Sequence, residues 1–432
     1  MMAQMSDPFS DTLTIYASII TVGDELLIGQ VVDTNSAWIA QELNKAGIWL
    51  RRRVSVGDSK AEIIHALDEE SRNAAIVLIT GGLGPTADDI TKPVLCAYFG
   101  GSLVIDPAAL ANVKAIFAGL NRPVIERNLK QAEVPDNCTV IPNHRGTAPG
   151  MWFEKNGKIF VSMPGVPHEM KGMMTGYVIP HLQRYFTFPF IDHRTLLTFG
   201  IGESFLAETI KDWEAQLPAH LTLAYLPHYG MVRLRITGSD NNNSRLQETL
   251  NTQFEKLKTL VAEWLVAGED ITLAQVIGNM LVQKKQTVAT AESCTGGYIA
   301  HLITSVAGSS AWFKGSVVSY ANEVKEKVLG VQKATLQLAG AVSEDTVKQM
   351  VDGVREKMQT DYAIATSGIM GPGGATAGKP AGTVWVAAGS GTRTITAVFH
   401  FRYDRARNIE MTSYYALNLL RKLIAGERAS LP

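Results

Sequence analysis

The stretch TVATAESCTGGYIAHL, residues 287–302, joins a short apolar and β-branched run to a segment with the composition of a helix. A buried strand that leads directly into a helix is the repeating unit of α/β folds. Glu292, Ser293, Cys294 and Thr295 fall at this junction, and two glycines follow them. Ser293 at such a turn either caps the helix or projects its hydroxyl as a nucleophile, and the local residues favour neither interpretation.

Strands and helices alternate on both sides of this stretch. Apolar strands predicted at 14–23 and 75–80 are separated by helical segments, and a second series begins at about 271. Strands separated by helices of this length predict parallel sheets that are covered on both faces. The fold class that we predict is therefore α/β, with two parallel-sheet α/β domains at 13–175 and 270–428.

The segment 190–262 is predicted to be a small α+β block that resembles a KH-like module. Its glycine pair, Gly200 and Gly202, is one residue too close for the GxxG backbone clamp of RNA-binding KH domains. We therefore expect this module to connect the two α/β domains rather than to bind RNA.

Composition limits the classes of function. A chain of 432 residues predicts two or three domains, and a formal net charge of −1 with interspersed signs argues against nucleic-acid binding driven by bulk charge. The three cysteines are far apart, which fits a reducing compartment. The first residues lack a signal-peptide pattern, and no apolar run approaches about 20 residues, so we expect a cytoplasmic protein without a membrane span.

Two loops at the carboxyl ends of N-terminal strands carry both carboxylates and glycines. They are GDELLIGQ, residues 23–30, and GGLGPTADD, residues 81–89. Glycine-rich turns let backbone N–H groups approach a phosphate, and hard carboxylate oxygens suit Mg²⁺ or a similar ion. The alternative is a plain turn in which Asp88 and Asp89 cap the next helix, and this loop alone leaves both interpretations open.

Several longer motifs, spread over nearly the whole chain, resemble the CinA (competence/damage-inducible) family. They are TVGDELLIGQVVDTNSAWIA, TGGLGPTADDIT, GTAPGMWF, MPGVPHEM, FGIGES, LAYLP, VRLRITG, AESCTGG, GSVVSYANEVKEKVLGV and SGIMGPGG. The resemblance implies an N-terminal domain related to molybdopterin-binding proteins and a C-terminal nicotinamide mononucleotide (NMN) amidohydrolase domain. It further implies two activities in pyridine-nucleotide salvage, hydrolysis of NMN to nicotinate mononucleotide and ammonia, and metal-dependent hydrolysis of ADP-ribose.

For the C-terminal domain, the resemblance implies Ser293 as the nucleophile, Lys325 as the base and Tyr320 as a third catalytic residue. A lysine acts as a base only after it loses a proton, which desolvation encourages. The N–H groups from Cys294 to Gly297, at a helix N-terminus, would receive the oxyanion, and we interpret Cys294 itself as a buried small hydrophobic residue. The expected substrate ligands are Thr295, Gly296, Gly297, Asn322, Thr366, Ser367, Gly368, Gly371 and Gly373, with Arg405 for the phosphate and Arg407 in reserve.

The sequence departs from the family pattern beside these arginines. Tyr403 stands where a glycine is expected, and Glu410 stands where a second basic residue is expected.

For the N-terminal domain, we expect the metal ligands Asp24, Glu25, Asp88 and Asp89 and the substrate ligands Gly81, Gly82, Gly84 and Thr86. The metal would be Mg²⁺, Co²⁺ or Mn²⁺, and the deamidase would need no cofactor. The expected partners are NMN and ADP-ribose, with no membrane and no nucleic acid, and the expected assembly is a homodimer. Two rival hypotheses are a non-catalytic interaction protein associated with competence or DNA damage, and a pterin-nucleotide-binding protein.

Overall fold

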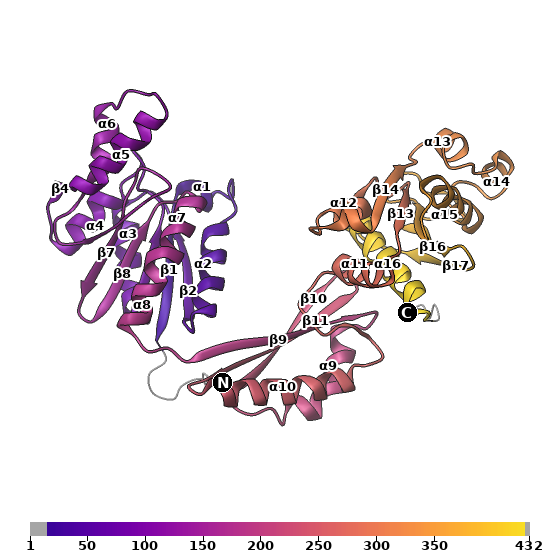
Figure 1. Cartoon of the computed structure of the whole chain (residues 1–432), viewed down its shortest axis with the longest axis horizontal. Coiled ribbons are helices and arrows are strands. Elements are labelled where there is room, and N and C mark those ends of the chain that lie inside the picture. Colours follow the sequence, from indigo (N-terminus) through magenta and orange to yellow (C-terminus); the bar gives the residue numbers. More distant parts are fainter. Residues whose placement is uncertain (1–14, 428–432) are drawn as a thin grey trace. The chain divides into compact units, whose positions relative to one another are not determined.

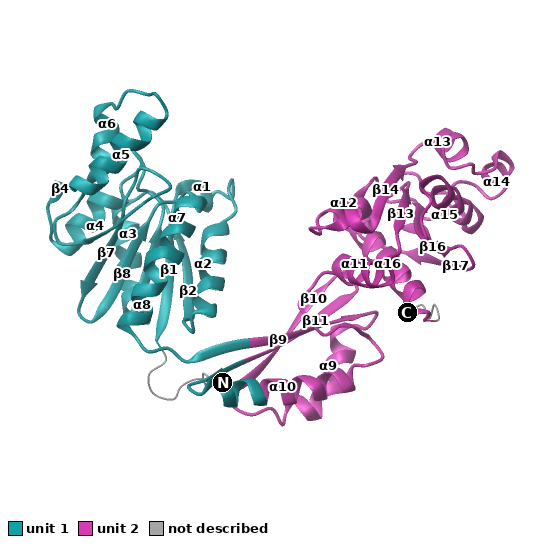
Figure 2. Ribbon diagram, viewed as in Figure 1, with its two compact units in different colours: residues 1–192, 238–248 teal, residues 193–237, 249–432 magenta. Residues whose placement is uncertain are grey.

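The computed structural model describes residues 15–427 (Figure 1). The predicted domain limits at residues 13 and 428 lie outside these described residues. The chain divides into two compact units, coloured separately in Figure 2. One extends to Asp192 and includes Gly238–Glu248, and the other comprises His193–Thr237 and the chain from Thr249 onward.

The N-terminal domain is built on a six-stranded sheet in the order β2-β1-β3-β8-β7-β6. The four strands β2, β1, β3 and β8 are parallel, whereas β7 and β6 run antiparallel at one edge. The predicted parallel sheet is therefore the core of a mixed sheet. The strands are β1 (Tyr16–Val22), β2 (Trp49–Val56), β3 (Ile76–Thr80), β6 (Thr139–Ile141), β7 (Gly150–Lys155) and β8 (Lys158–Met163).

Successive residues of β1 face opposite sides of this sheet, as the pleat requires. Ile19 packs with α2 (Thr34–Lys45), α7 (Pro167–Met173) and α8 (Ile179–Tyr185), whereas Ile20 packs with α3 (Lys60–Asn73) and α4 (Thr91–Phe99). A π-helical turn, Met174–Val178, joins α7 to α8. The smaller elements are α1 (Asp24–Leu27), β4 (Leu103–Ile105), α5 (Pro107–Gly119), α6 (Glu126–Leu129), the 3₁₀ turn Lys130–Ala132 and β5 (Glu133–Pro135).

The middle module is a four-stranded sheet in the order β10-β11-β9-β12 with two helices. Its elements are β9 (Phe190–Phe199), α9 (Glu203–Glu214), β10 (Leu221–His228), β11 (Met231–Asp240), α10 (Asn243–Leu260) and β12 (Leu265–Ala267). The KH-like α+β arrangement is confirmed. Tyr229 and Gly230, both with positive φ, form the tight turn between β10 and β11.

The C-terminal domain has a five-stranded sheet in the order β14-β13-β15-β16-β17. The strands β14 (Phe313–Val318), β13 (Val288–Glu292) and β15 (Tyr362–Gly368) are parallel. The strands β16 (Thr383–Ser390) and β17 (Thr394–His400) continue the sheet as an antiparallel edge. This sheet is therefore also mixed, with parallel strands on one side and an antiparallel hairpin at the other edge.

Helices cover both faces of this second sheet. One face packs against α11 (Leu273–Lys284), α12 (Tyr298–Thr304) and α16 (Arg405–Ala425), and the other packs against α15 (Glu344–Met358). The short elements are the 3₁₀ turn Ser309–Ala311, α13 (Asn322–Lys327) and α14 (Lys333–Leu338).

The KH-like module contributes apolar side chains to the core of the C-terminal domain. Leu197, Phe199 and Met231 belong to the same buried cluster as the residues of α11 and α16. The rings of Phe199 and Tyr415 meet edge to face, with centroids 5.0 Å apart. This module therefore shares a hydrophobic core with the C-terminal domain.

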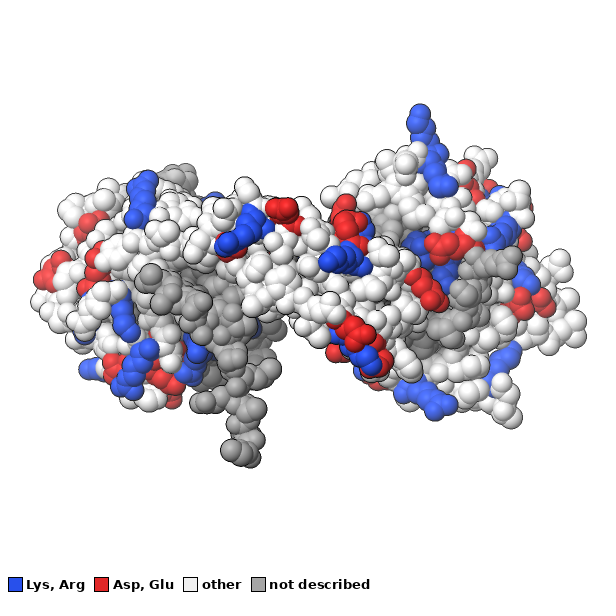
Figure 3. Space-filling model, turned by 90° about the horizontal axis from the view of Figure 1, so that it is seen from below, with Lys and Arg blue, Asp and Glu red and all other residues white. Residues whose placement is uncertain are grey.

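Within residues 15–427, no helix is both long and apolar enough to cross a membrane. On the face drawn in Figure 3, Lys and Arg side chains are interspersed with Asp and Glu side chains rather than separated by sign.

Candidate active site

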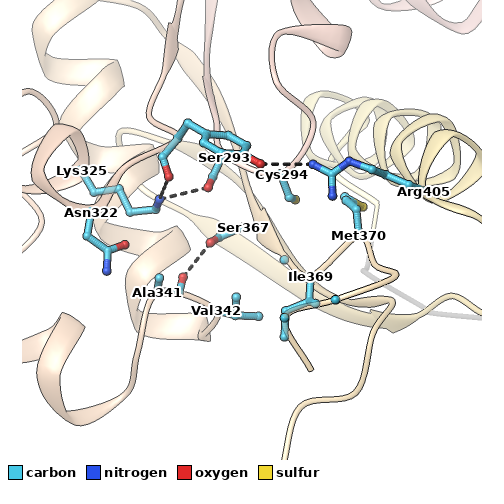
Figure 4. Close-up of a pocket in the computed structure, with 14 residues that line it drawn as sticks. Ser293, Cys294, Asn322, Lys325, Ala341, Val342, Ser367, Ile369, Met370 and Arg405 are labelled. Atoms are coloured by element: carbon cyan, nitrogen blue, oxygen red, sulfur yellow. Dashed lines mark hydrogen bonds between the residues drawn. The ribbon is translucent and has the colours of Figure 1, made fainter. Parts of the chain in front are cut away.

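Ser293 and Lys325 meet in the C-terminal domain although they lie 32 residues apart in the sequence. Ser293 directly follows β13, and its N–H donates to the carbonyl of Thr366 at 3.0 Å, which extends the strand pairing to the nucleophile position. Lys325 lies on α13, and its Nζ is 3.0 Å from Ser293 Oγ (Figure 4). The strand end and the short helix thus bring an amine within hydrogen-bonding reach of a hydroxyl.

Burial determines the electrostatics of this pair. The Lys325 side chain is only 1% exposed, and this desolvation lowers the pKa of its amine. Its other partners are the carbonyls of Ser319 at 2.7 Å and Tyr320 at 3.4 Å, and both are neutral acceptors. A buried amine without a carboxylate among these partners is suited to accept a proton from a neighbouring hydroxyl.

The turn after Ser293 differs from the sequence prediction. The helix α12 begins at Tyr298 instead of near Thr295, because Gly297 adopts a left-handed conformation with φ 98°. The first N–H groups of this helix donate to the Glu292 carboxylate, from Gly297 at 3.0 Å, Ile299 at 3.0 Å and Ala300 at 2.8 Å. The Gly296 N–H donates to the carbonyl of Ser293 at 3.2 Å. The expectation that Gly296 and Gly297 would serve an oxyanion is therefore wrong for this conformation, and the N–H groups of Cys294 and Thr295 are the candidates that remain.

Glu292 holds this turn together, a role that the sequence analysis did not assign to it. Its carboxylate is fully buried and also accepts hydrogen bonds from the hydroxyls of Thr295 at 2.8 Å and Thr290 at 3.2 Å. Thr295 and Thr366 hydrogen bond to each other at 2.8 Å inside this network, so neither hydroxyl is directed to a substrate here. The signal in the sequence was a single acid at the end of an apolar strand, where an unpaired charge is costly.

A cavity of about 270 Å³ adjoins the Ser293–Lys325 pair. Several predicted site residues line it, namely Ser293, Tyr320, Asn322, Lys325, Ser367, Gly368, Gly373 and Arg405. Val342, Ile369 and Met370 add an apolar wall that was not predicted from the sequence. The predicted ligands Thr295, Gly296, Gly297, Thr366, Gly371 and Arg407 are not among the lining residues.

Arg405 and Tyr320 form one side of the cavity. The Arg405 guanidinium donates to the Tyr320 hydroxyl at 3.1 Å and to the carbonyl of Gly371 at 3.0 Å. Arg407 instead lies over the Tyr403 ring, 4.1 Å from its centroid. Of the two predicted arginines, Arg405 is the one that can reach a bound anion here.

Cys294 lies beside Ser293 but is buried in the hydrophobic core of the domain. Burial raises the pKa of its thiol to about 12. The thiolate form, which a cysteine nucleophile requires, is therefore disfavoured at neutral pH.

The predicted loops of the N-terminal domain meet at the carboxyl edge of its sheet. A cavity of about 150 Å³ there is lined by Glu25, Asp33, Asn35 and Gly81, among other residues. Asp89 does not cap α4, because its carboxylate accepts from the N–H groups of Gly84 and Thr86, both at 2.8 Å, and holds the loop itself. The helix-capping alternative for Asp89 is thus wrong. The other predicted residues are not among the lining residues, namely Asp24, Gly82, Gly84, Thr86, Asp88 and Asp89.

A third acidic loop, not predicted from the sequence, joins this edge. Asp58 follows β2, and Asp24 and Asp58 each accept a hydrogen bond from the backbone N–H of the other, at 3.1 Å and 3.0 Å. Burial, followed by the charges of Asp24, Glu25 and Asp88, raises the pKa of Asp58. Asp58 could have been found from the rule that ligands bind where parallel strands end.

These carboxylates have the chemistry of a hard-cation site but not a complete coordination shell. Between residues 15 and 427, no group of three or more His, Cys, Asp or Glu side chains is close enough to hold a metal ion. A Mg²⁺-like ion would therefore need water and substrate oxygens to complete its shell, as is usual for Mg²⁺ with phosphates.

Known proteins resemble this chain in all three parts. Three family models match consecutive parts of the chain. The model described as a probable molybdopterin binding domain matches residues 18–184, and the damage-inducible protein CinA KH domain matches residues 193–267. The CinA C-terminal domain matches residues 270–424. The chain thus combines a molybdopterin-binding-like α/β domain, a KH-like module and a second α/β domain with a buried serine–lysine pair.

Individual relatives agree with these matches. A CinA-like protein of Cytophaga hutchinsonii is 47% identical over 408 residues, which cover 94% of this chain and 98% of that protein. A putative competence-damage inducible protein of Caldicellulosiruptor saccharolyticus is 40% identical, over 94% of this chain and 99% of that protein. The solved structure of competence/damage inducible protein CihA from Agrobacterium tumefaciens is 37% identical and covers 35% of this chain and 93% of that one, with a TM-score of 0.35. The chain belongs to the CinA family.

Proposed function

We propose that the C-terminal domain hydrolyses the carboxamide of NMN to nicotinate mononucleotide and ammonia. The observation that carries this proposal is the buried Lys325 amine, with its lowered pKa, 3.0 Å from the Ser293 hydroxyl beside a cavity. Amide hydrolysis by a serine needs such a base to remove the hydroxyl proton. The cavity volume of about 270 Å³ is at the small end for ligand sites and suits a mononucleotide better than a dinucleotide.

In the first half of the reaction, neutral Lys325 takes the proton of Ser293 as Oγ forms a bond to the carboxamide carbon. The carbonyl π electrons move to oxygen, and the N–H groups of Cys294 and Thr295 would receive this oxyanion. The oxyanion then reforms the carbonyl, the C–N bond breaks, and the Lys325 ammonium returns the proton to the departing nitrogen. Ammonia leaves, and an ester of Ser293 remains.

Water completes the reaction. Lys325, again neutral, takes a proton from the attacking water, and the tetrahedral intermediate expels Ser293 Oγ, which regains a proton from Lys325. No cofactor is required in this scheme. The resemblance implied Tyr320 as a third catalytic residue. Its hydroxyl accepts a hydrogen bond from Arg405, and we assign it to orienting that arginine.

The remaining cavity residues fit the rest of NMN. Arg405 supplies a guanidinium for the phosphate, and Ser367, whose hydroxyl donates to the carbonyl of Ala341 at 2.7 Å, lies at the end of β15. Val342, Ile369 and Met370 offer an apolar surface for the pyridine ring.

Ammonia release from NMN by three variants tests the proposal. Ser293→Ala and Lys325→Ala should bind NMN in calorimetry but lose on the order of 10⁴-fold in rate, because nucleophile and base act as a unit. Cys294→Ala should stay within roughly tenfold of the wild type, since a buried thiol acts as a small hydrophobic group. An active Ser293→Ala beside an inactive Cys294→Ala would exclude the assigned nucleophile.

We further propose that the N-terminal domain hydrolyses ADP-ribose with a divalent metal ion. The supporting observation is that Asp24 and Asp58 join two acidic loops at one edge of the sheet, where burial and then the nearby carboxylates raise the pKa of Asp58. Neutralisation of the diphosphate charge is what Mg²⁺, Mn²⁺ or Co²⁺ would supply there. In this scheme Asp24 and Asp58 hold the two loops in register, and Glu25 faces the cavity.

An assay of ADP-ribose turnover with and without added metal tests this second activity. Asp58→Asn should abolish metal-dependent turnover and leave ammonia release from NMN unchanged. Inactivity of the wild-type protein on both substrates would favour a non-catalytic interaction protein or a pterin-nucleotide-binding protein instead. We also propose a cytoplasmic location and a homodimer, and light scattering of the purified protein tests the dimer.

A further inference from the structure

The β10–β11 hairpin of the KH-like module contacts α16, one of the two helices that begin at the candidate site. The Tyr229 ring stacks on Tyr414 of α16, with centroids 5.6 Å apart, and His228 Nε2 is 3.3 Å from the Tyr414 hydroxyl. Gly230 allows this close approach, because a Cβ there would lie 2.8 Å from the Tyr415 ring. The hairpin is thus packed tightly on α16.

Glu410 connects the hairpin to both helices. It lies on α16, and its Oε1 accepts a hydrogen bond from the Tyr298 hydroxyl of α12 at 3.4 Å. The Glu410 carboxylate also lies beside the Tyr229 hydroxyl of the hairpin, and this carboxylate raises the pKa of Tyr229. One carboxylate therefore joins a hairpin, α12 and α16.

Both helices place site residues at their first turns. Tyr298 is the first residue of α12 and directly follows the turn of residues 293–297 that contains the nucleophile. Arg405 is the first residue of α16 and lines the cavity. The position of α16 relative to α12 therefore sets how far the Arg405 guanidinium lies from Ser293.

We infer that Tyr229 and Glu410 are positioning residues for substrate binding, through which the KH-like module forms part of the deamidase site. This inference rests on the proposed NMN hydrolysis. Tyr229 and Glu410 do not line the cavity and act through Arg405. Arg405 would hold the phosphate, far from the bond that breaks. A displaced Arg405 therefore weakens the binding of substrate and transition state equally.

Matched tyrosine variants test the inference. Tyr229→Phe removes the hydroxyl beside Glu410, and the control Tyr225→Phe removes a hydroxyl that donates to Glu214 within the module at 2.6 Å. Tyr229→Phe and Glu410→Ala should each raise KM for NMN by roughly three- to tenfold with kcat within about twofold, whereas Tyr225→Phe should leave both constants unchanged. The double variant should be no worse than the poorer single variant, because both changes cut the same connection. Glu410→Gln keeps an acceptor and should recover most of the affinity.

A second measurement does not depend on activity. Hydrogen exchange of the backbone amides at 405–411 should speed up in Tyr229→Phe and Glu410→Ala and stay at the wild-type rate in Tyr225→Phe. Unchanged exchange, or an unchanged KM in an active protein, would overturn the inference. A wild-type protein that releases no ammonia would refute the proposed function, and the exchange result would then decide alone whether the hairpin holds α16.

Discussion

The lowered pKa of Lys325 predicts a linked pH dependence of activity and stability. Replacement of Lys325 by Met removes the amine and keeps a side chain of similar length. In the folded protein the amine is desolvated, whereas in the unfolded chain it has the ordinary pKa near 10.5. Between these two pKa values the unfolded state binds more protons, so the free energy of unfolding rises with pH.

The size of this effect follows from the distance between the two pKa values. Below the folded-state pKa the protein carries the full cost of a buried ammonium, and this cost disappears as pH rises towards 10.5. One pH unit between the folded and unfolded pKa values corresponds to about 1.4 kcal/mol. Between the folded-state pKa and 10.5, the free energy of unfolding of the wild type relative to Lys325→Met should therefore increase by about 1.4 kcal/mol per pH unit.

Two assays measure the same pKa independently. Urea unfolding at a series of pH values gives the stability difference, with Lys327→Met as a control that removes an exposed lysine from the same helix. The acidic limb of kcat/KM for NMN gives the pKa of the base in the free enzyme. If the two values disagree, or if the stability difference is flat with pH while kcat/KM is not, Lys325 is not the base.

Three further predictions concern the rest of the chain. Glu292→Gln should lower the free energy of unfolding, measured in urea, by about 1–3 kcal/mol, because the amide cannot accept from every buried N–H group that the Glu292 carboxylate binds. A variant as stable as the wild type would contradict the role of Glu292 in holding the turn. Asp89→Asn should strongly reduce metal-dependent ADP-ribose hydrolysis and leave ammonia release unchanged, because an amide has one acceptor oxygen for the two N–H groups that hold loop 81–89, and full ADP-ribose turnover would contradict this. In calorimetry, a fragment that begins at residue 193 should melt roughly 5 °C or more above a fragment that begins at residue 270, because Leu197 and Phe199 belong to the C-terminal core. Equal melting temperatures of the two fragments would refute a shared core.

The strand and helix pattern of the sequence was sufficient to predict the fold class, since alternating apolar strands and amphipathic helices indicate covered sheets. The antiparallel edges were not predicted, because β7–β8 and β16–β17 are hairpins whose turns carry little periodic signal. The KH-like module was identified, but its shared core with the C-terminal domain depends on packing between β9, β11 and α16, which sequence periodicity does not encode.

At the site, the motif resemblance identified Ser293 and Lys325, and the choice of Arg405 before Arg407 agrees with its position at the cavity. The position of Glu292 at the end of an apolar strand indicates that its charge needs partners, but the sequence does not identify them, because its donors come from β13, the following turn and α12. For the same reason the number of free N–H groups after Ser293 was overestimated. A buried acceptor inside the turn is invisible until the chain is folded.

Burial of the cysteines has a consequence for covalent inhibitors. Burial raises the pKa of the Cys96 thiol. It raises the pKa of Cys138 to about 11 and the pKa of Cys294 to about 12. A thiol with a pKa near 12 is ionised in only about one molecule in 10⁵ at pH 7, and the thiolate is the form that reacts. Alkylating reagents and mild oxidants should therefore spare the cavity, whereas carbamates or fluorophosphonates, which trap an activated serine, should label Ser293 and leave Cys294 unmodified.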